Sequence, residues 1–141
     1  MTRPASKAWT LIHHRNLEII EVRYAGAITA QDMLEGSVAR LELAAKESVS
    51  DFLLDGSECT ADKATAEVVY DIVTREYPIR RVDPNSRFAF LPPESPHALW
   101  LVDFFEAMCE QHGLASRRFP DRDSAIAWLT SADAPSADIP E

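Results

Sequence analysis

The segment over residues 51–55 contains a run of three apolar side chains, Phe52, Leu53 and Leu54, with no polar residue between them. Neighbouring side chains of a β-strand point to opposite faces of the sheet, so a strand that is apolar at successive positions is buried on both faces. The run therefore predicts a central strand of a sheet that carries helices on both of its faces.

Strand-like and helix-like segments alternate around this run. Residues 9–13 and 17–24 predict two strands joined by a turn over residues 14–16, and Gly26 is expected to end the second strand. The further expected elements are a helix beginning at Thr29, the central strand, a loop over residues 56–60, a helix carrying Ala64, Val68, Val69, Ile72 and Val73 that Pro78 ends, a strand over residues 86–91, a helix over residues 96–112, a strand over residues 116–119, and a helix after Asp121.

The order of these elements defines the expected fold class. It reads β-β-α-β-α-β-α-β-α, and repeated β-α units join right-handedly into a parallel or mixed sheet. We therefore predict an α/β domain with a five-stranded, mixed but mostly parallel sheet and four helices. With 141 residues and 46% hydrophobic residues, the chain is large enough for one core. The domain is expected over residues 1–131, and residues 132–141, with two prolines and three acidic residues, are expected to be a disordered acidic tail.

Several helix ends carry capping residues. Thr29 and Asp32 have the spacing of a capping box, in which each side chain accepts from the other residue's backbone N–H group. Ser95 followed by Pro96 is a helix start, and Gly113 stands where a left-handed residue ends a helix.

Two faces are expected for the helix that begins at Thr29. Its apolar face, expected against the sheet, consists of Ala30, Leu34, Val38, Leu41 and Ala45. Its opposite face, expected in solvent, consists of Glu35, Arg40, Glu42, Lys46 and Glu47.

Charge and targeting signals restrict the partners and the location. The 23 acidic residues exceed the 14 basic ones, for a net charge of −9, which disfavours nucleic acid and anionic membranes as partners. The sequence contains no secretory signal and no apolar stretch near the roughly 20 residues that a membrane span needs, so no stable membrane insertion is expected. The two cysteines form no C-x-x-C pair, and a cytoplasmic location is expected.

Four stretches of the chain resemble a known family. They are the predicted hairpin with the residues from Gly26 to Asp32, the strand over residues 51–55, the strand over residues 87–91 before a long helix, and the ending Phe119-Pro-Asp121 with Ala125, Trp128 and Leu129, which is the most specific. Together they cover roughly residues 8–131 and resemble the SpoIIAA-like family of the STAS (sulfate transporter and anti-sigma-factor antagonist) superfold.

This resemblance implies a regulatory protein that is not an enzyme. STAS-type domains bind protein partners or sense nucleotides, and the best known are switched by phosphorylation of a serine in an Asp-Ser-Ser-Gly element. Residues 55–62 occupy the matching place but lack that element, so Ser57 and Thr60 are the phosphorylation candidates although neither lies in the family's motif. SpoIIAA-like proteins also resemble the lipid-binding SEC14 (CRAL-TRIO) fold, which implies an alternative function as a carrier of an apolar ligand or lipid.

The ends of two predicted strands are candidate ligand sites, because α/β proteins bind ligands at the carboxyl ends of their strands. Asp55 and Ser57 follow one strand, and Pro92 and Glu94 follow another. Both pairs precede an expected helix start, whose free N–H groups could hold an anion. The alternative is that Gly56 and the prolines simply form turns.

The predicted helix over residues 96–112 is apolar around most of its circumference. One stripe is Ala98, Val102, Phe105, Met108 and Cys109, and a second stripe is Trp100, Phe104 and Ala107. An outer helix normally buries one face, so the second stripe requires a cover. The candidates are the last helix with Trp128, a second copy of the chain in a homodimer, or an apolar ligand in a pocket lined by Trp100, Phe104, Met33 and Leu34.

Catalysis and metal binding have little support in the sequence. Ser57 lacks the Gly-x-Ser-x-Gly pattern of a nucleophile elbow. His13 and His14 are neighbours on a predicted strand and would point to opposite faces. No cofactor and no metal are expected.

The leading hypothesis is a non-enzymatic cytoplasmic regulator that binds a protein partner or a small ligand. The alternatives are the apolar-ligand carrier and, third, a small hydrolase acting over residues 55–62.

Overall fold

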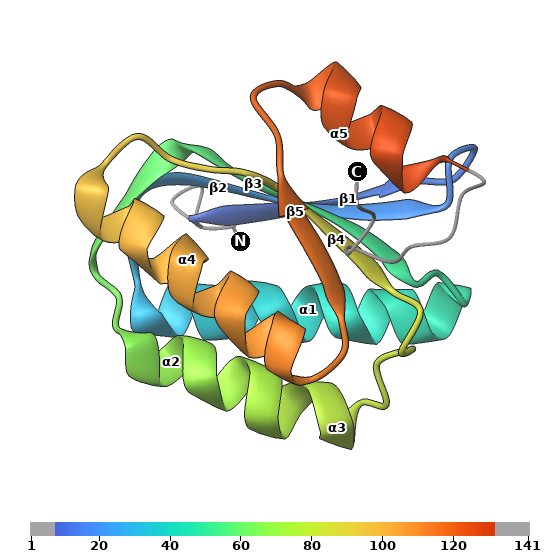
Figure 1. The fold of residues 1–141 in the computed structure, drawn as a ribbon, viewed down its shortest axis with the longest axis horizontal. Coiled ribbons are helices and arrows are strands. Elements are labelled where there is room, and N and C mark those ends of the chain that lie inside the picture. The colour runs from blue at the N-terminus through green and yellow to red at the C-terminus, as the bar shows by residue number, and fades with distance from the viewer. Residues whose placement is uncertain (1–7, 132–141) are drawn as a thin grey trace, which may run out of the picture.

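The computed structural model describes residues 8–131 and shows the predicted α/β fold (Figure 1). Its five-stranded sheet has the order β1-β2-β3-β4-β5, in which β1 is antiparallel to β2 and all other neighbours are parallel. The strands are β1 (Trp9–His14), β2 (Ile19–Thr29), β3 (Asp51–Lys63), β4 (Arg87–Leu91) and β5 (Ala115–Arg118). The helices are α1 (Ala30–Glu47), α2 (Ala66–Asp71), the π-helix η1 (Ile72–Glu76), α3 (Tyr77–Ile79), α4 (Pro96–Gln111) and α5 (Arg122–Leu129). The tail expected over residues 132–141 lies outside the described residues.

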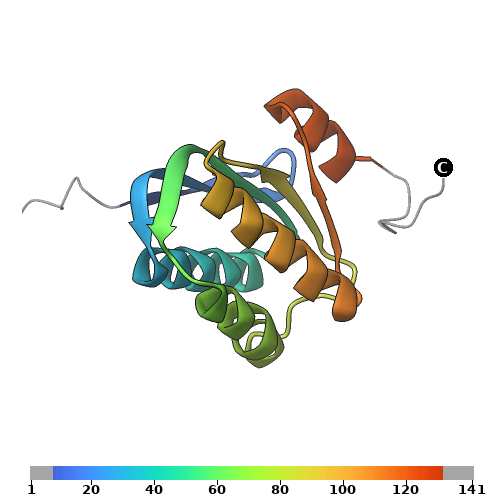
Figure 2. The ribbon, with the colours of Figure 1, turned by 60° about the vertical axis from the view of Figure 1, so that its left-hand side comes forward.

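Helices cover both faces of the sheet. α1, α2 and α4 lie on one face and α5 lies on the other, as Figure 2 also shows. Phe52 and Leu54 belong to the core under α1, α2 and α4, whereas Leu53 between them belongs to the core under α5. This confirms the prediction of a central strand that is buried on both faces.

β2 and β3 are longer than expected, and the segment over residues 56–60 is strand and not loop. The two strands continue to pair, with Gly26 opposite Cys59 and Thr29 opposite Lys63. Gly26 does not end β2: it has a φ of +79°, which glycine adopts readily, and it lies beside a shift in the register. The two expectations were wrong because each segment supplies the backbone partners of the other, and neither segment shows this by itself.

The N-terminus of α1 is capped as predicted. The Asp32 N–H donates to Thr29 Oγ1 at 3.1 Å, and the Thr29 N–H donates to Asp32 Oδ2 at 2.9 Å. This capping box satisfies two backbone donors at the start of the helix.

The buried face of α1 is turned relative to the prediction. Its buried residues are Gly36, Ser37, Arg40, Leu41 and Ala44. Ala45, expected inside, is exposed, and Arg40, expected in solvent, is only 2% exposed. Gly36 has no side chain and that of Ser37 is small, so this face lets α1 approach the sheet closely.

The other helix ends also agree with the sequence. The Ala98 N–H donates to Ser95 Oγ at 3.3 Å at the start of α4, and Gly113 has a φ of +74° just after its end. The Ser124 N–H donates to Asp121 Oδ1 at 2.8 Å and caps α5. The helical run from α2 to α3 ends one residue after Pro78, and the π-turn before it joins the Tyr77 N–H to the Ile72 carbonyl.

Candidate functional site

A pocket opens between α1, α4 and the sheet, near the point where the pairing of β3 with β4 ends. Its volume is about 100 Å³. We call it the α1–α4 pocket, and its lining residues are Tyr24, Ile28, Met33, Ser37, Arg40, Leu54, Gly56, Cys59, Ala61, Val69, Ile72, Phe90, Leu91, Pro93, Ala98, Leu101, Val102 and Phe105. Most of these side chains are apolar, so the pocket suits a small apolar group with a few polar anchors.

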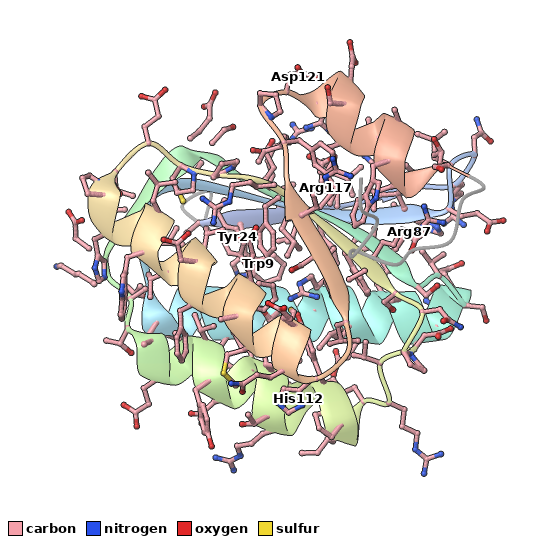
Figure 3. The ribbon with its side chains drawn as sticks, viewed as in Figure 1. Trp9, Tyr24, Arg87, His112, Arg117 and Asp121 are labelled. Atoms are coloured by element: carbon pink, nitrogen blue, oxygen red, sulfur yellow. The ribbon has the colours of Figure 1, made fainter. Side chains whose placement is uncertain are left out.

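The wall from β2 is formed by Tyr24 and Ile28, and Tyr24 pairs with Trp9 of the neighbouring strand (Figure 3). A β-carbon added at Gly36 would lie 2.6 Å from the Tyr24 hydroxyl oxygen, so the ring crosses α1 where a helix residue has no side chain. The Tyr24 hydroxyl donates to the Met33 carbonyl at 3.5 Å. Burial raises the pKa of Tyr24, which keeps this hydroxyl neutral inside the pocket.

The inner end of the pocket is formed by Arg40. Its Nη2 donates to the Tyr77 hydroxyl oxygen at 2.7 Å. Its Cζ lies 5.1 Å from the centre of the Phe52 ring and 5.8 Å from that of Phe88. No described residue accepts a hydrogen bond from its Nε or Nη1. A buried guanidinium with two unpartnered nitrogens is the most unusual feature of the pocket, because buried charges in proteins are normally paired.

The titratable groups whose pKa the Arg40 charge affects are Tyr24, Tyr77 and Cys109, and all three are neutral at neutral pH. Burial raises the pKa of Tyr24 and raises that of Cys109 to about 12. Burial also raises the pKa of Tyr77, against the opposing effect of the Arg40 charge. Arg40 therefore has neutral neighbours, and its charge has no counter-ion among the described residues.

Arg40, the residue that most distinguishes the pocket, was expected in solvent, and this expectation was wrong. The signal that could have found it is the spacing of Gly36, Ser37, Arg40 and Leu41, which share one helix face. Small residues beside an arginine on an otherwise apolar face indicate space that its side chain can fill.

Asp55 and Ser57 lie on the other side of the sheet. The Ser57 N–H and hydroxyl donate to Asp55 Oδ1 at 3.0 and 2.7 Å, and Arg122 of α5 donates to Asp55 Oδ2 at 3.2 Å. The expectation that they precede a helix start was wrong, because β3 continues to Lys63 and α2 begins at Ala66. Ser57 therefore does not precede the start of α2 directly.

The charges near Asp55 form what we call the Glu21 cluster: Glu21, Asp55, His14, Arg23 and Arg122. Glu21 is 0% exposed and accepts hydrogen bonds from Arg122 and, at 3.0 Å, from Arg23, while His14 Nε2 lies 2.6 Å from its carboxylate. Burial acts to raise the pKa of Glu21, but the hydrogen bonds from Arg122, His14 and Arg23 outweigh it and hold this pKa below its ordinary value. The two carboxylates of this cluster are paired with two guanidinium groups and an imidazole, and Arg122 ties α5 to the sheet.

The remaining strand-end candidates lie around the pocket mouth or in solvent. Pro93, next to the predicted Pro92, lines the pocket, whereas Glu94 is exposed. Ser57 and Thr60, the phosphorylation candidates, are both exposed on β3. The strand ends therefore contribute Gly56, Leu91 and Pro93 to the pocket, all without a charged side chain.

The second stripe of α4 does not line the pocket as expected. Trp100 is 50% exposed, and its ring stacks against Phe104 with the centroids 6.2 Å apart, while Phe104 itself is half-buried against the core. Leu34 is half-buried against the core, so of the four predicted lining residues only Met33 lies in the pocket. The expected cover from the last helix was wrong, because α5 lies on the opposite face of the sheet (Figure 1), where Trp128 packs against the second core.

A second hollow of about 270 Å³ lies at the other end of α1, and Arg80, Arg81 and Ser86 are among its lining residues. Its Arg80 is already paired, with Glu42 and Glu76 at 3.1 and 3.0 Å. The α1–α4 pocket is thus the better candidate, because its cation has no such partner.

Among residues 8–131, no three histidine, cysteine, aspartate or glutamate side chains are grouped so that they could hold a metal ion. In the same part of the chain, every helix is too short or too polar to cross a membrane. Comparisons with protein-family models, with curated proteins and with solved structures found no match to this chain.

Proposed function

We propose that this chain is a non-enzymatic domain that binds a small ligand in the α1–α4 pocket. The observation that carries the proposal is the composition of the pocket: apolar walls from α1, α4, β3 and β4 surround the few polar groups of Tyr24, Ser37 and Arg40. Sites of this kind hold the apolar body of a ligand by burial and orient it with a few polar contacts.

The size of the pocket limits the ligand. A dry protein cavity of about 150 Å³ accepts benzene. The α1–α4 pocket, at about 100 Å³, is smaller than that cavity, so the buried part of its ligand is a group no larger than a benzene ring. The domain then acts either as a carrier that retains its ligand or as a regulatory sensor that exchanges it, and the SpoIIAA-like resemblance stays a prediction.

Native mass spectrometry of the freshly purified protein, beside ¹H–¹⁵N spectra during titration with toluene, tests this proposal. We expect a retained ligand mass that is lost on denaturation, or saturable shifts at pocket residues. Ala98→Leu, which fills the pocket from α4, should weaken toluene binding at least tenfold. Ala107→Leu adds the same atoms on the exposed side of α4 and should leave binding unchanged. Absence of both a retained mass and saturable shifts would contradict the proposal.

A second candidate function is self-association through the outer side of α4. Trp100 stacks between His97, at a centroid distance of 5.9 Å, and Phe104, and exposed aromatic groups of this kind mark interaction surfaces. Sedimentation velocity over a range of concentrations tests this function. A dimer that Trp100→Ser converts to monomer supports it, and a monomer at all concentrations contradicts it.

A further inference from the structure

The inference concerns the chemical class of the ligand, and it rests on the proposed function of the α1–α4 pocket. Arg40 lines this pocket and is only 2% exposed. An arginine guanidinium stays charged in a protein interior. Burial of such a charge is costly unless the charge is paired and its donors are satisfied.

The protein itself meets this requirement only in part. Nη2 donates to the neutral hydroxyl of Tyr77, and the rings of Phe52, Tyr77 and Phe88 lie within cation–π distance of the Arg40 guanidinium. Nε and Nη1 have no acceptor among residues 8–131. The wall of the pocket therefore carries a buried positive charge, two of whose nitrogens lack an acceptor, and no described anion balances it.

The position of Arg40 defines how a ligand would lie. Met33, Ser37 and Arg40 occupy successive turns of α1 and all line the pocket. Gly56 and Pro93 line it where β3 and β4 stop pairing, at the carboxyl ends of the strands. An anionic group thus belongs at the inner end, beside Arg40, and an apolar body belongs between Met33 and Ala98.

The single charge of Arg40 and the apolar walls of the pocket restrict the chemical class of the ligand further. One guanidinium balances one negative charge, so a dianion such as a phosphate monoester would bury a second charge without a partner. The walls are apolar, so an anion without an apolar body would leave most of the pocket unfilled. We propose that the α1–α4 pocket binds a small apolar carboxylic acid, whose carboxylate pairs with Arg40 and whose ring or short chain fills the space between α1 and α4.

Isothermal titration calorimetry with benzoate and benzamide at pH 7 tests this inference, because the two molecules have nearly the same shape and differ in charge. We expect the wild-type protein to bind benzoate at least tenfold more tightly than benzamide. Acetate, which has the carboxylate and no ring, should bind at least tenfold more weakly than benzoate. Arg40→Met, which keeps the length and loses the charge, should abolish the preference for benzoate.

The outcomes separate this inference from the proposed function. Equal binding of benzoate and benzamide overturns the carboxylate inference and leaves a pocket for neutral ligands. Acetate binding as tightly as benzoate overturns it also, because the site then selects an anion alone. Failure of benzoate, benzamide and toluene to bind, together with the absence of a retained ligand mass, overturns the proposed function itself. The wild-type comparison does not depend on the folding of the Arg40→Met variant, whose melting curve is recorded beside it.

Discussion

Tyr24 and Gly36 pack so closely that a β-carbon at position 36 would lie 2.6 Å from the Tyr24 hydroxyl oxygen and 3.1 Å from the nearest ring carbon. Glycine inside a helix costs about 1 kcal/mol relative to alanine. Its presence in α1 is therefore explained by the Tyr24 ring, which shapes one wall of the α1–α4 pocket.

Gly36→Ala should therefore destabilise the protein although alanine favours helix. We expect a loss of about 1–3 kcal/mol in the free energy of unfolding, because the added methyl group displaces a packed ring. Urea denaturation measures this loss. The same substitution in a Tyr24→Phe background should cost less, since the nearest contact atom is gone, and an equal cost in both backgrounds would contradict the packing argument.

Tyr77→Phe removes the one hydroxyl that accepts from Arg40. We expect the free energy of unfolding, measured by urea denaturation, to fall by about 1.5–3 kcal/mol, the usual range for a hydrogen bond to a charged group. Arg40→Met alone should be neutral or stabilising by about 1–4 kcal/mol, because it removes a buried charge without a counter-ion. Combining the two substitutions completes a double-mutant cycle, in which Tyr77→Phe should cost little once Arg40 is methionine.

Glu21→Gln should change how stability depends on pH. The folded-state pKa of Glu21 lies below the ordinary value of 4.5, so its stabilising contribution is fully present above that pH and is lost as the pH falls through the folded-state pKa. We expect Glu21→Gln to lower the free energy of unfolding at pH 7 by about 1.5–3 kcal/mol. The difference from wild type should shrink below pH 4.5 in thermal melts, and a difference that is constant with pH would show that the effect comes from shape and not from charge.

The two cysteines should be unreactive in the folded protein. Burial raises the pKa of Cys59 to about 11 and that of Cys109 to about 12, so very little thiolate forms at pH 8, and both side chains are buried. Ellman's reagent should react with two thiols only after guanidinium unfolding. Fast reaction of one thiol in native buffer would indicate that the pocket, which Cys59 lines, opens readily.

Local signals explain the part of the fold that could be predicted from the sequence. The capping pair Thr29 and Asp32 and the sequence Ser95-Pro96 act on backbone groups within a few residues, so their effect does not depend on the rest of the chain. The apolar run at Phe52, Leu53 and Leu54 likewise indicates burial on both faces whatever covers it.

The candidate site was much less predictable. Met33 lines the α1–α4 pocket, whereas Trp100 and Phe104 do not: Trp100 is half exposed and Phe104 packs against the core beside it. Which face of α1 turns toward the sheet depends on how closely that face can approach the sheet. This in turn depends on a residue of β2, Tyr24, which packs beside Gly36.

The sequence by itself determined the order of strands and helices, their caps and the central position of β3, because those features follow from periodicity and from short-range hydrogen bonds. Tertiary structure alone decided that Arg40 is buried, since its partner Tyr77 lies 37 residues away along the chain. It also decided that β2 and β3 pair beyond Gly26, and that α5 covers the face opposite α4. These outcomes depend on groups that meet only when the chain folds, so no local pattern of residues contains them.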